Sequence, residues 1–324
     1  MAFALFDRAN IPYRTLDGAM FPAIDIGRHQ PPKPVEDEAF WDEPHGSLRA
    51  YLTPDAGFVE DPALAAHNLM AAAEADGATF RFRSGVVGVH SVDGVVSGIE
   101  LATGEVIMAS VVVNAAGPHS SYINKLAGAM RDSVLTTRPL RQEVHVVPAP
   151  RNFDLGHGGI AVSDTDLGTY FRPNPGGTLT VGGVEPECDP LVWIEDPDEL
   201  DPNPTVGVWE AQTLRLARRL PDVGVPNRPV GLAAAYDVST DWLPIYDRTE
   251  IDGFYVAIGT SGNQFKNAPM VGPLMGALID ACESGRDHDH DPVVVVGPRT
   301  GLPINIGSFS RLRTPQNTTN SVLG

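Results

Sequence analysis

The feature that most constrains the fold is a buried strand, a glycine turn and a helix between Phe254 and Asp280. Residues 254–258 form a short apolar run typical of a strand buried on both faces of a layered α/β sheet. Gly259 and Gly262 follow at once, and the helix behind them ends at Gly285. Glycines let backbone approach a ligand, and a helix N-terminus presents N–H groups and partial positive charge. The unit suits an electron-rich ligand, although a merely tight connection needs the same glycines.

A second strand end carries small residues. The apolar run Val111–Val113 leads into Asn114 and then into Ala115, Ala116 and Gly117. Small residues at a strand end leave room for a flat ligand or one that lies along the backbone. Packing of a sheet against a helix selects small residues as well, so this run alone leaves both interpretations open.

The rest of the pattern alternates helices and strands. Asp61 and Pro62 are suited to begin a helix and Gly77 to end it, and a small antiparallel meander follows. Its expected strands are Thr79–Arg83, Val86–Val92 and Val95–Leu101, with Asp93-Gly94 as a tight turn. Further on, strands are predicted at Leu140–Val147, Thr169–Arg172 and Thr178–Gly183, a helix with arginines on its outer side at Glu210–Leu220, and a loose polar tail from Thr314.

Composition excludes several classes of protein. With 41 acidic against 23 basic residues, the net charge is -18, which disfavours nucleic acid and anionic lipid as partners. The longest apolar stretches are too short to span a bilayer, so we expect no membrane association. Cys188 and Cys282 are isolated and indicate neither a disulfide framework nor a thiolate zinc site, which favours a reducing, cytoplasmic location. The segment Asp287–Asp291 has metal-ligand residue types but no distant partner, so we predict a solvated loop and no metal.

Three longer runs resemble a known family. They are VVVNAAGPHSS at 111–121, GTYFRPNPGGTLTVGGVE at 168–185, and YDVSTDWLPIYDRTEIDGFYVAIGTSGNQFKNAPMVG at 236–272. All three resemble FAD-dependent oxidoreductases of the D-amino-acid oxidase superfamily, especially the sarcosine oxidase, glycine oxidase and dimethylglycine dehydrogenase branch. The resemblance extends over residues 14–313. It implies non-covalent FAD and oxidation of a small amine or amino acid by hydride transfer to the flavin.

The resemblance also implies roles for single residues. Val87 would meet the adenine through its backbone, and Ala115, Ala116 and Gly117 would line the adenosine end of FAD. The loop along the isoalloxazine ring would comprise Gly259, Thr260, Ser261, Gly262, Asn263, Gln264, Phe265 and Lys266. Its amides would stabilise negative charge on the reduced flavin. Lys266 would lie near the reactive face of the flavin as the catalytic residue, although a lone lysine is more often a solvated surface residue.

Substrate-binding residues are expected on other strands. Arg172, between Phe171 and Pro173, is suited to bind a substrate carboxylate through two hydrogen bonds. The alternative is that it forms a structural ion pair at the surface, at the end of a strand. Tyr51, Tyr170 and Tyr236 are weaker candidates for lining the same pocket, because buried tyrosines with satisfied hydroxyls are common.

The chain departs from the family pattern in two places. Covalent flavin members carry a cysteine where Ala234 stands, so covalent attachment at that position is excluded. No strand is followed by G-x-G-x-x-G and a helix, the unit that binds the FAD pyrophosphate. We therefore expect a fragment of a longer protein or a partner polypeptide that supplies this segment. The rival hypothesis is a non-catalytic flavoprotein-like subunit that has lost FAD.

The expected fold class is a two-lobed α/β flavoprotein fold of the α+β kind, with a partial FAD-binding lobe and a mainly antiparallel substrate lobe. Residues 61–118 and 236–290 are assigned to the FAD lobe, residues 1–60 and 119–235 to the substrate lobe, and residues 291–324 to a C-terminal tail.

Overall fold

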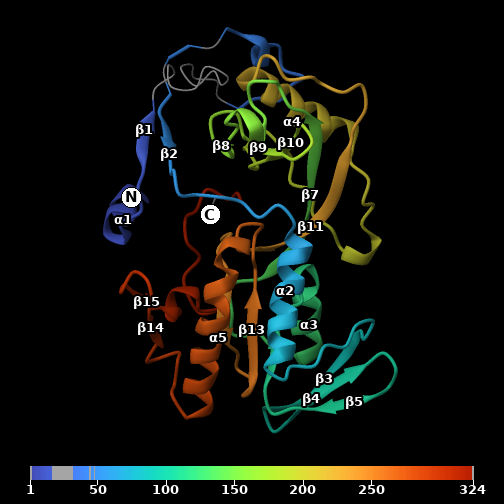
Figure 1. Cartoon of the computed structure of the whole chain (residues 1–324). Helices are drawn as coiled ribbons and strands as arrows, with labels where there is room; N and C mark the ends of the chain where they lie inside the picture. The colour runs from blue at the N-terminus through green and yellow to red at the C-terminus, as the bar shows by residue number, and fades with distance from the viewer. Residues whose placement is uncertain (1, 17–31, 44, 47, 323–324) are drawn as a thin grey trace. The chain divides into compact units, whose positions relative to one another are not determined.

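The computed structural model describes residues 2–16, 32–43, 45–46 and 48–322 (Figure 1). The chain divides into two compact units, each described here by itself. Unit 1 comprises Met1–Phe80, Gln142–Leu191 and Asp201–Ala234, and unit 2 comprises Arg81–Arg141, Val192–Leu200 and Ala235–Gly324. The assignment of lobes to functions remains a prediction. Unit 2 holds most of the segments expected in the FAD lobe, whereas the helix after Asp61 is grouped with unit 1.

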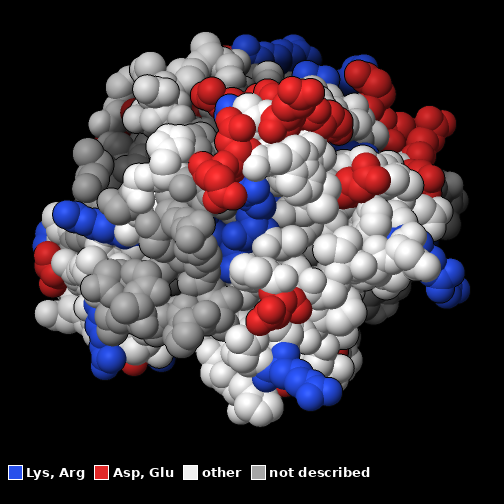
Figure 2. Space-filling view, turned by 90° about the horizontal axis from the view of Figure 1, so that it is seen from above, with Lys and Arg blue, Asp and Glu red and all other residues white. Residues whose placement is uncertain are grey.

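Acidic side chains gather in patches on the face shown in Figure 2, and smaller basic groups lie between them. This distribution agrees with the net charge of -18. In the described part of the chain, no helix is both long enough and apolar enough to cross a membrane.

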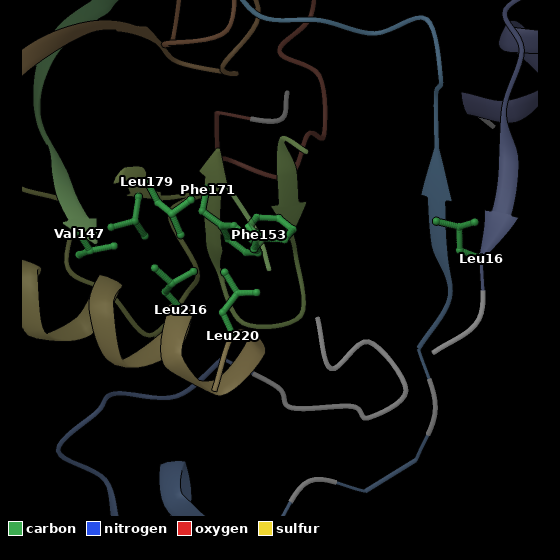
Figure 3. Packing of buried hydrophobic residues seen from close by; sticks show 8 residues of the cluster. Leu16, Val147, Phe153, Phe171, Leu179, Leu216 and Leu220 are labelled. Atoms are coloured by element: carbon green, nitrogen blue, oxygen red, sulfur yellow. The ribbon is translucent and has the colours of Figure 1, made fainter. Parts of the chain in front are cut away.

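Most of a five-stranded antiparallel sheet, in the order β11-β7-β10-β9-β8, lies in unit 1, whereas residues 137–141 of β7 and 235–239 of β11 are grouped with unit 2. The strands are β7 (Thr137–Pro148), β8 (Val162–Asp164), β9 (Thr169–Asn174), β10 (Thr178–Gly183) and β11 (Gly231–Ser239). Alternate residues of β9 are buried, as expected for a sheet with one covered face. Figure 3 shows Phe171 and Leu179 packed against Leu216 and Leu220, the latter two at the helix that covers the sheet. This contact forms the core of unit 1.

That covering helix, α4 (Val206–Arg219), begins earlier than predicted and differs in the placement of its arginines. The prediction that they lie on the outer side is wrong for Arg215 and Arg219, which are only 0% and 1% exposed. Arg215 pairs with Asp189 at 2.5 Å, and Arg219 pairs with Asp164 at 2.5 Å. Helical periodicity assigns charged residues to the solvent side, because carboxylate partners this distant in sequence leave no local signal.

The remaining elements of unit 1 are α1 (Ala2–Ala9), β1 (Arg14–Leu16), β2 (Ala50–Leu52) and α2 (Pro62–Ala75). The predicted ends of α2 are confirmed. The Asp61 carboxylate accepts a hydrogen bond from the Leu64 amide at 2.9 Å, and Gly77 adopts φ +97° just beyond the helix. Short 3-10 helices are η2 (Glu38–Trp41), η4 (Leu155–His157) in unit 1, and η3 (Gly117–His119), η5 (Pro197–Glu199), η6 (Phe265–Asn267) and η7 (Ile306–Phe309) in unit 2.

Unit 2 is centred on a three-stranded sheet in the order β12-β13-β6. It contains β6 (Val112–Asn114), β12 (Ile245–Arg248) and β13 (Phe254–Ile258), and β13 runs parallel to β6 and antiparallel to β12. Both faces of β13 are covered, as predicted. Phe254, Val256 and Ile258 pack in one core cluster, and Tyr255 packs in another with helix α5 (Ala268–Glu283), which lies alongside β13 in Figure 1.

The meander of unit 2 consists of β3 (Val86–Val92), β4 (Val95–Leu101) and β5 (Val106–Met108). Asp93 and Gly94 both have positive φ, 51° and 82°, which is the geometry of the predicted tight turn. The strand predicted at Thr79–Arg83 is absent, and the segment is a coil ending in a turn. An alternating pattern needs a neighbouring strand to form a ladder, and the β3-β4-β5 sheet provides none for this segment.

The C-terminal part of unit 2 carries the hairpin β14 (Val294–Val296) and β15 (Pro303–Asn305). The segment from Thr314, predicted to be loose, is attached through Asp241 as far as the structure describes it. The Gln316 amide donates to the Asp241 carboxylate at 3.2 Å, and the Thr318 hydroxyl donates to the Asp241 carbonyl at 3.0 Å. Polar residues predicted a solvated tail here because the buried carboxylate that holds them lies far away in sequence.

Candidate functional site

Two turns leave the same edge of the unit 2 sheet. In the parallel pair, Val256 of β13 lies opposite Asn114 of β6. Ala115–Gly117 follow β6 and the Gly259–Gly262 turn follows β13, so both turns begin where parallel strands end. The carboxyl edge of a parallel sheet is the usual place for a ligand in α/β proteins. The structure therefore brings together the two segments that the sequence singled out.

The first turn is held by Asn114, a residue that the sequence analysis did not select. Its side chain is buried, accepts the Ala116 amide at 3.1 Å and donates to the Ser120 carbonyl at 2.9 Å. It also donates to Asn124 at 2.8 Å, which ties the turn to helix α3 (Ser120–Ala127). Gly117 adopts φ +57°, which favours glycine. The available signal in the sequence was an asparagine that directly follows three valines at the end of a buried strand.

A cavity of about 330 Å³ lies beside β6. It is lined almost entirely by apolar residues: Val86, Val89, Ile99, Val112, Val113, Asn114, Ala115, Ala116 and Ile123. Val87 lies between two lining residues, at a register irregularity of the β3–β4 ladder, and its side chain is 45% exposed. A bulge at this position leaves Val87 without a residue of its own opposite on β4.

The second turn is tight and left-handed. Gly259, Ser261 and Gly262 have φ values of 69°, 46° and 75°. A Cβ atom on Gly262 would lie 2.2 Å from the Tyr236 ring, so that tyrosine packs directly against the turn. The buried Ser261 hydroxyl donates to the Gly259 carbonyl at 3.2 Å. Only a residue without a side chain fits at position 262.

Asp237 holds this turn from β11 and was also missed by the sequence analysis. Its carboxylate accepts the Gly259 amide at 2.6 Å, and its carbonyl accepts the Ser261 amide at 2.8 Å. Asp237 is 2% exposed, and burial raises the pKa of its carboxyl to about 6, against the lowering effect of the Gly259 hydrogen bond. An acidic residue within the otherwise uncharged strand from Gly231 was the signal that could have found it.

The amides of the turn fall into two sets. Those of Gly259, Ser261 and Asn263 donate to Asp237 or to the Thr260 carbonyl. Within the described residues, the amides of Thr260 and Gly262 donate to no protein acceptor. These two N–H groups are therefore the donors that the turn offers to an electron-rich ligand.

Lys266 lies in η6, just before α5. Its ammonium group donates to the Asn263 carbonyl at 2.7 Å, and although the side chain is exposed, partial desolvation of the ammonium lowers its pKa. The side-chain amide oxygen of Gln264, Oε1, accepts from the Tyr246 hydroxyl at 3.0 Å, and Phe265 is exposed. The predicted loop is thus a compact, self-bonded turn that presents Lys266 at the surface of unit 2.

The other predicted residues lie in unit 1. Tyr170 and Arg172 share a face of β9, where Arg172 donates to Asn174 at 2.7 Å and its guanidinium stacks 4.6 Å from the centre of the Phe58 ring. Among the described residues, no carboxylate pairs with Arg172. Tyr51 lines a cavity of about 990 Å³, whose wall also includes Phe58. Burial raises the pKa of Tyr170 to about 12, so its hydroxyl remains a hydrogen-bond donor at neutral pH.

The segment Asp287–Asp291 is only in part the solvated loop that was predicted, because Asp287, His290 and Asp291 are exposed but His288 and Asp289 turn inward. His288 is buried and its Nδ1 accepts the Val293 amide at 3.1 Å, whereas Asp289 pairs with Arg311 at 2.8 Å. Asp247 of β12, which is far away in sequence but close in space, draws this segment inward. Its carboxylate also pairs with Arg311. In the part of the chain that the structure describes, no three possible metal ligands come together.

Comparisons with known proteins bear on the family and the fold of the chain. The family model described as FAD dependent oxidoreductase matches residues 24–278. A comparison with curated protein sequences finds no significant match. Among solved structures, the chain resembles L-proline dehydrogenase from P. horikoshii with 18% identity and a TM-score of 0.66, over 88% of this chain and 68% of that one. It also resembles glycine oxidase from Geobacillus kaustophilus, with 21% identity and a TM-score of 0.65 over 96% and 70%. Iminodiacetate oxidase from Chelativorans sp. BNC1 follows at 17% identity and a TM-score of 0.61 over 86% and 67%.

Proposed function

Because this chain belongs to the family of FAD-dependent oxidoreductases, we propose that it oxidises the carbon–nitrogen bond of a small amine or amino acid. The substrate class is an N-methylglycine-like amine or a D-amino acid. The observation that carries the proposal is the shared carboxyl edge of β6 and β13, with two free amides on one turn and an apolar cavity beside the other.

The residues present at this edge fit FAD. The Gly259–Gly262 turn would offer its Thr260 and Gly262 amides to a flat ring, whereas the side of Gly262 where a Cβ would lie is filled by the Tyr236 ring. The apolar cavity lined by Val86, Val89 and Ala116 suits an adenine ring, and we propose that the backbone of Val87, next in the chain to Val86, meets this ring. When bound, FAD supplies the electron sink that accepts a hydride from the carbon beside the amine. The Thr260 and Gly262 amides and Lys266 would face the ring edge where negative charge then develops.

Arg172 is the group that we propose for a substrate carboxylate. Its guanidinium is held in place by Asn174 and the Phe58 ring but is not neutralised by a described acidic side chain. A planar guanidinium held in this way can bind a carboxylate through two parallel hydrogen bonds. Tyr170, on the same face of β9, and Tyr51 are the further substrate-binding candidates of unit 1, and Tyr236 is a candidate of unit 2. Loss of the hydride and of a nitrogen proton gives an imine, which water hydrolyses.

We expect the FAD pyrophosphate to be held by a segment that the printed sequence does not contain. The sequence has no G-x-G-x-x-G turn after a strand, and within the described residues the second edge of β6 pairs with no strand. The compared structures named above are matched over 67–70% of their length. Either the rest of a longer chain or a partner polypeptide would supply this segment. We expect the chain by itself to bind FAD weakly, because its charge of -18 repels the pyrophosphate.

The function is tested by anaerobic bleaching of the flavin absorbance, in protein produced together with a phosphate-binding segment, by N-methylglycine, glycine, D-alanine and proline. We expect at least one of them to bleach the flavin. Absence of a flavin spectrum under all conditions would instead support the rival hypothesis, a non-catalytic subunit without FAD.

The role of Arg172 is tested in the same assay. We expect Arg172→Met to raise the KM for an amino-acid substrate on the order of tenfold or more, because a charge-assisted hydrogen bond to the carboxylate is lost. An amine without a carboxylate should be affected little. Arg228→Met is the matched control, because Arg228 is an exposed arginine of the same unit. An equal effect of Arg172→Met on both kinds of substrate would exclude the carboxylate role.

A further inference from the structure

Asp237 is a buried acid without a basic partner. It is 2% exposed, and the groups that act on it are the Gly259 amide and the hydroxyls of Ser120 on α3 and Thr137 on β7. Among the described residues, no acidic or basic side chain faces it from any of these elements. A buried carboxylate without a cation costs stability, so a role in folding alone does not explain its presence.

The position of Asp237 explains what it does. Its carboxylate and its carbonyl hold Gly259 and Ser261, alternate residues of the turn, and the Ser239 amide of the same strand donates to the Ser261 hydroxyl at 3.3 Å. Left-handed backbone is unfavourable for a residue such as Ser261, so the turn needs contacts that hold it. With Gly259 and Ser261 engaged inside the protein, the amides at 260 and 262 are left for a ligand.

We propose that Asp237 is the positioning residue of the flavin loop, whose carboxylate holds the Gly259–Gly262 turn in the conformation that presents the Thr260 and Gly262 amides to the flavin ring. This inference rests on the proposed function for the identity of the ligand. The clamp itself depends only on contacts within the chain, so the two can be tested apart.

The protonation of Asp237 has opposite effects on the turn and on the whole fold. An ionised carboxylate is the stronger acceptor for the Gly259 amide, so the turn should be held better as pH rises through about 6. Since burial raises the pKa of Asp237 in the fold above its ordinary value of 3.8, this group's contribution to global stability is fully present below pH 3.8. It is lost as pH rises through about 6. Asparagine at position 237 should remove both pH dependences.

The clamp is tested by hydrogen–deuterium exchange of residues 254–267 in the full chain without flavin, at about pH 5 and about pH 7.5, corrected for intrinsic rates. We expect wild-type protection to rise with pH and protection in Asp237→Asn to stay level. Asp237→Ala should exchange on the order of tenfold faster, because the Gly259 amide loses its acceptor. Glu143→Gln, a change at a buried carboxylate of unit 1, should leave this segment unchanged. Equal protection in Asp237→Ala and wild type would overturn the proposal.

The connection to flavin is tested by equilibrium dialysis of FAD with the same four proteins, each produced together with a phosphate-binding segment. We expect Asp237→Ala to raise the dissociation constant on the order of tenfold and Asp237→Asn to keep it near the wild-type value at about pH 5. If the turn loosens in Asp237→Ala and FAD affinity does not change, the positioning role is wrong. If no flavin spectrum forms even in protein produced together with a phosphate-binding segment, the proposed function fails, while the clamp is judged by exchange alone.

Discussion

Individual polar side chains shape both turns at the carboxyl edge of the unit 2 sheet. Asn114 satisfies the turn after β6 through one amide group, and Asp237 satisfies the turn after β13 through one carboxylate. Both are buried, so each hydrogen bond is made in a medium where an unpaired polar group is costly. Lys266 differs from them because it is exposed and, among the residues described, its ammonium group bonds to its own turn alone. It is thus available for a role at the flavin.

We predict that Lys266 serves reoxidation of the flavin rather than oxidation of the substrate. A fixed ammonium group stabilises charge developing on oxygen, whereas the amine substrate needs no cation. In flavin-loaded protein, Lys266→Met should slow reoxidation by oxygen on the order of ~10²-fold and slow anaerobic reduction by substrate much less. Stopped-flow absorbance measures the two half-reactions separately.

Lys125→Met is the matched control for this change, because Lys125 is an exposed lysine of the same unit. It should alter neither half-reaction. Equal slowing of both half-reactions by Lys266→Met, or no slowing of either, would argue against the role. A small effect on reoxidation together with efficient use of an electron carrier would place the enzyme among dehydrogenases.

At the scale of elements, the unit from β13 through the turn to α5 depends on what surrounds each glycine. Gly262 has φ +75° and touches the Tyr236 ring, whereas Gly272 in α5 has no neighbouring atom within 4 Å of an added Cβ. The first glycine therefore serves the geometry of the turn. The second one only weakens a helix.

We predict opposite effects for alanine at these two positions. Gly262→Ala should lower the free energy of unfolding by about 2 kcal/mol or more, from left-handed strain and the clash with Tyr236. Gly272→Ala should raise it by about 0.5–1 kcal/mol, because alanine loses less entropy in a helix. Urea denaturation of the full chain measures both. A neutral Gly262→Ala would mean that the turn rearranges without cost.

Buried ion pairs connect elements that are distant in sequence. Arg311 is 2% exposed and pairs with Asp132, Asp247 and Asp289. Its guanidinium thus ties the C-terminal segment to β12 and to the loop after α5. Removing one partner of such a cluster is costly, because a buried charge is left uncompensated. The intact pairs add little to total stability, because desolvation offsets their attraction, so they matter more for which segments meet.

For the molecule as a whole, acidic residues far outnumber basic ones. A net charge of -18 produces repulsion among acidic groups, some of which gather in the patches of Figure 2. We predict that raising sodium chloride from about 10 to about 300 mM raises the Tm of the chain by a few degrees, because salt shortens the screening length. Scanning fluorimetry measures this change. Sucrose at equal osmolality is the control and should not reproduce it, and a falling Tm would contradict the prediction.

Local chemistry in the sequence was sufficient for several elements of this fold. The apolar run 254–258 predicted β13 with its observed bounds, and Asp61 and Gly77 predicted the ends of α2. Asp93-Gly94 likewise predicted its turn. In each case the signal and the structure lie within a few residues of one another, since caps, turns and alternating burial depend on neighbouring residues. The FAD-dependent family was predicted in a different way, from the resemblance of three longer runs to known members, and the family model confirms it.

The tertiary structure alone decided which distant groups meet. The sequence predicted exposed arginines on α4, a strand at 79–83 and a loose tail after Thr314, and all three differ because a partner far along the chain is present or missing. The sequence also gave no indication of the role of Asp237, because that role depends on the Gly259 amide lying next to its carboxylate. Hydrogen bonds and ion pairs act over a few ångströms, and folding brings together residues that sequence spacing does not relate. The sequence by itself therefore determined the turns and their glycines. Only the fold decided that the buried carboxylate of Asp237 holds one of these turns.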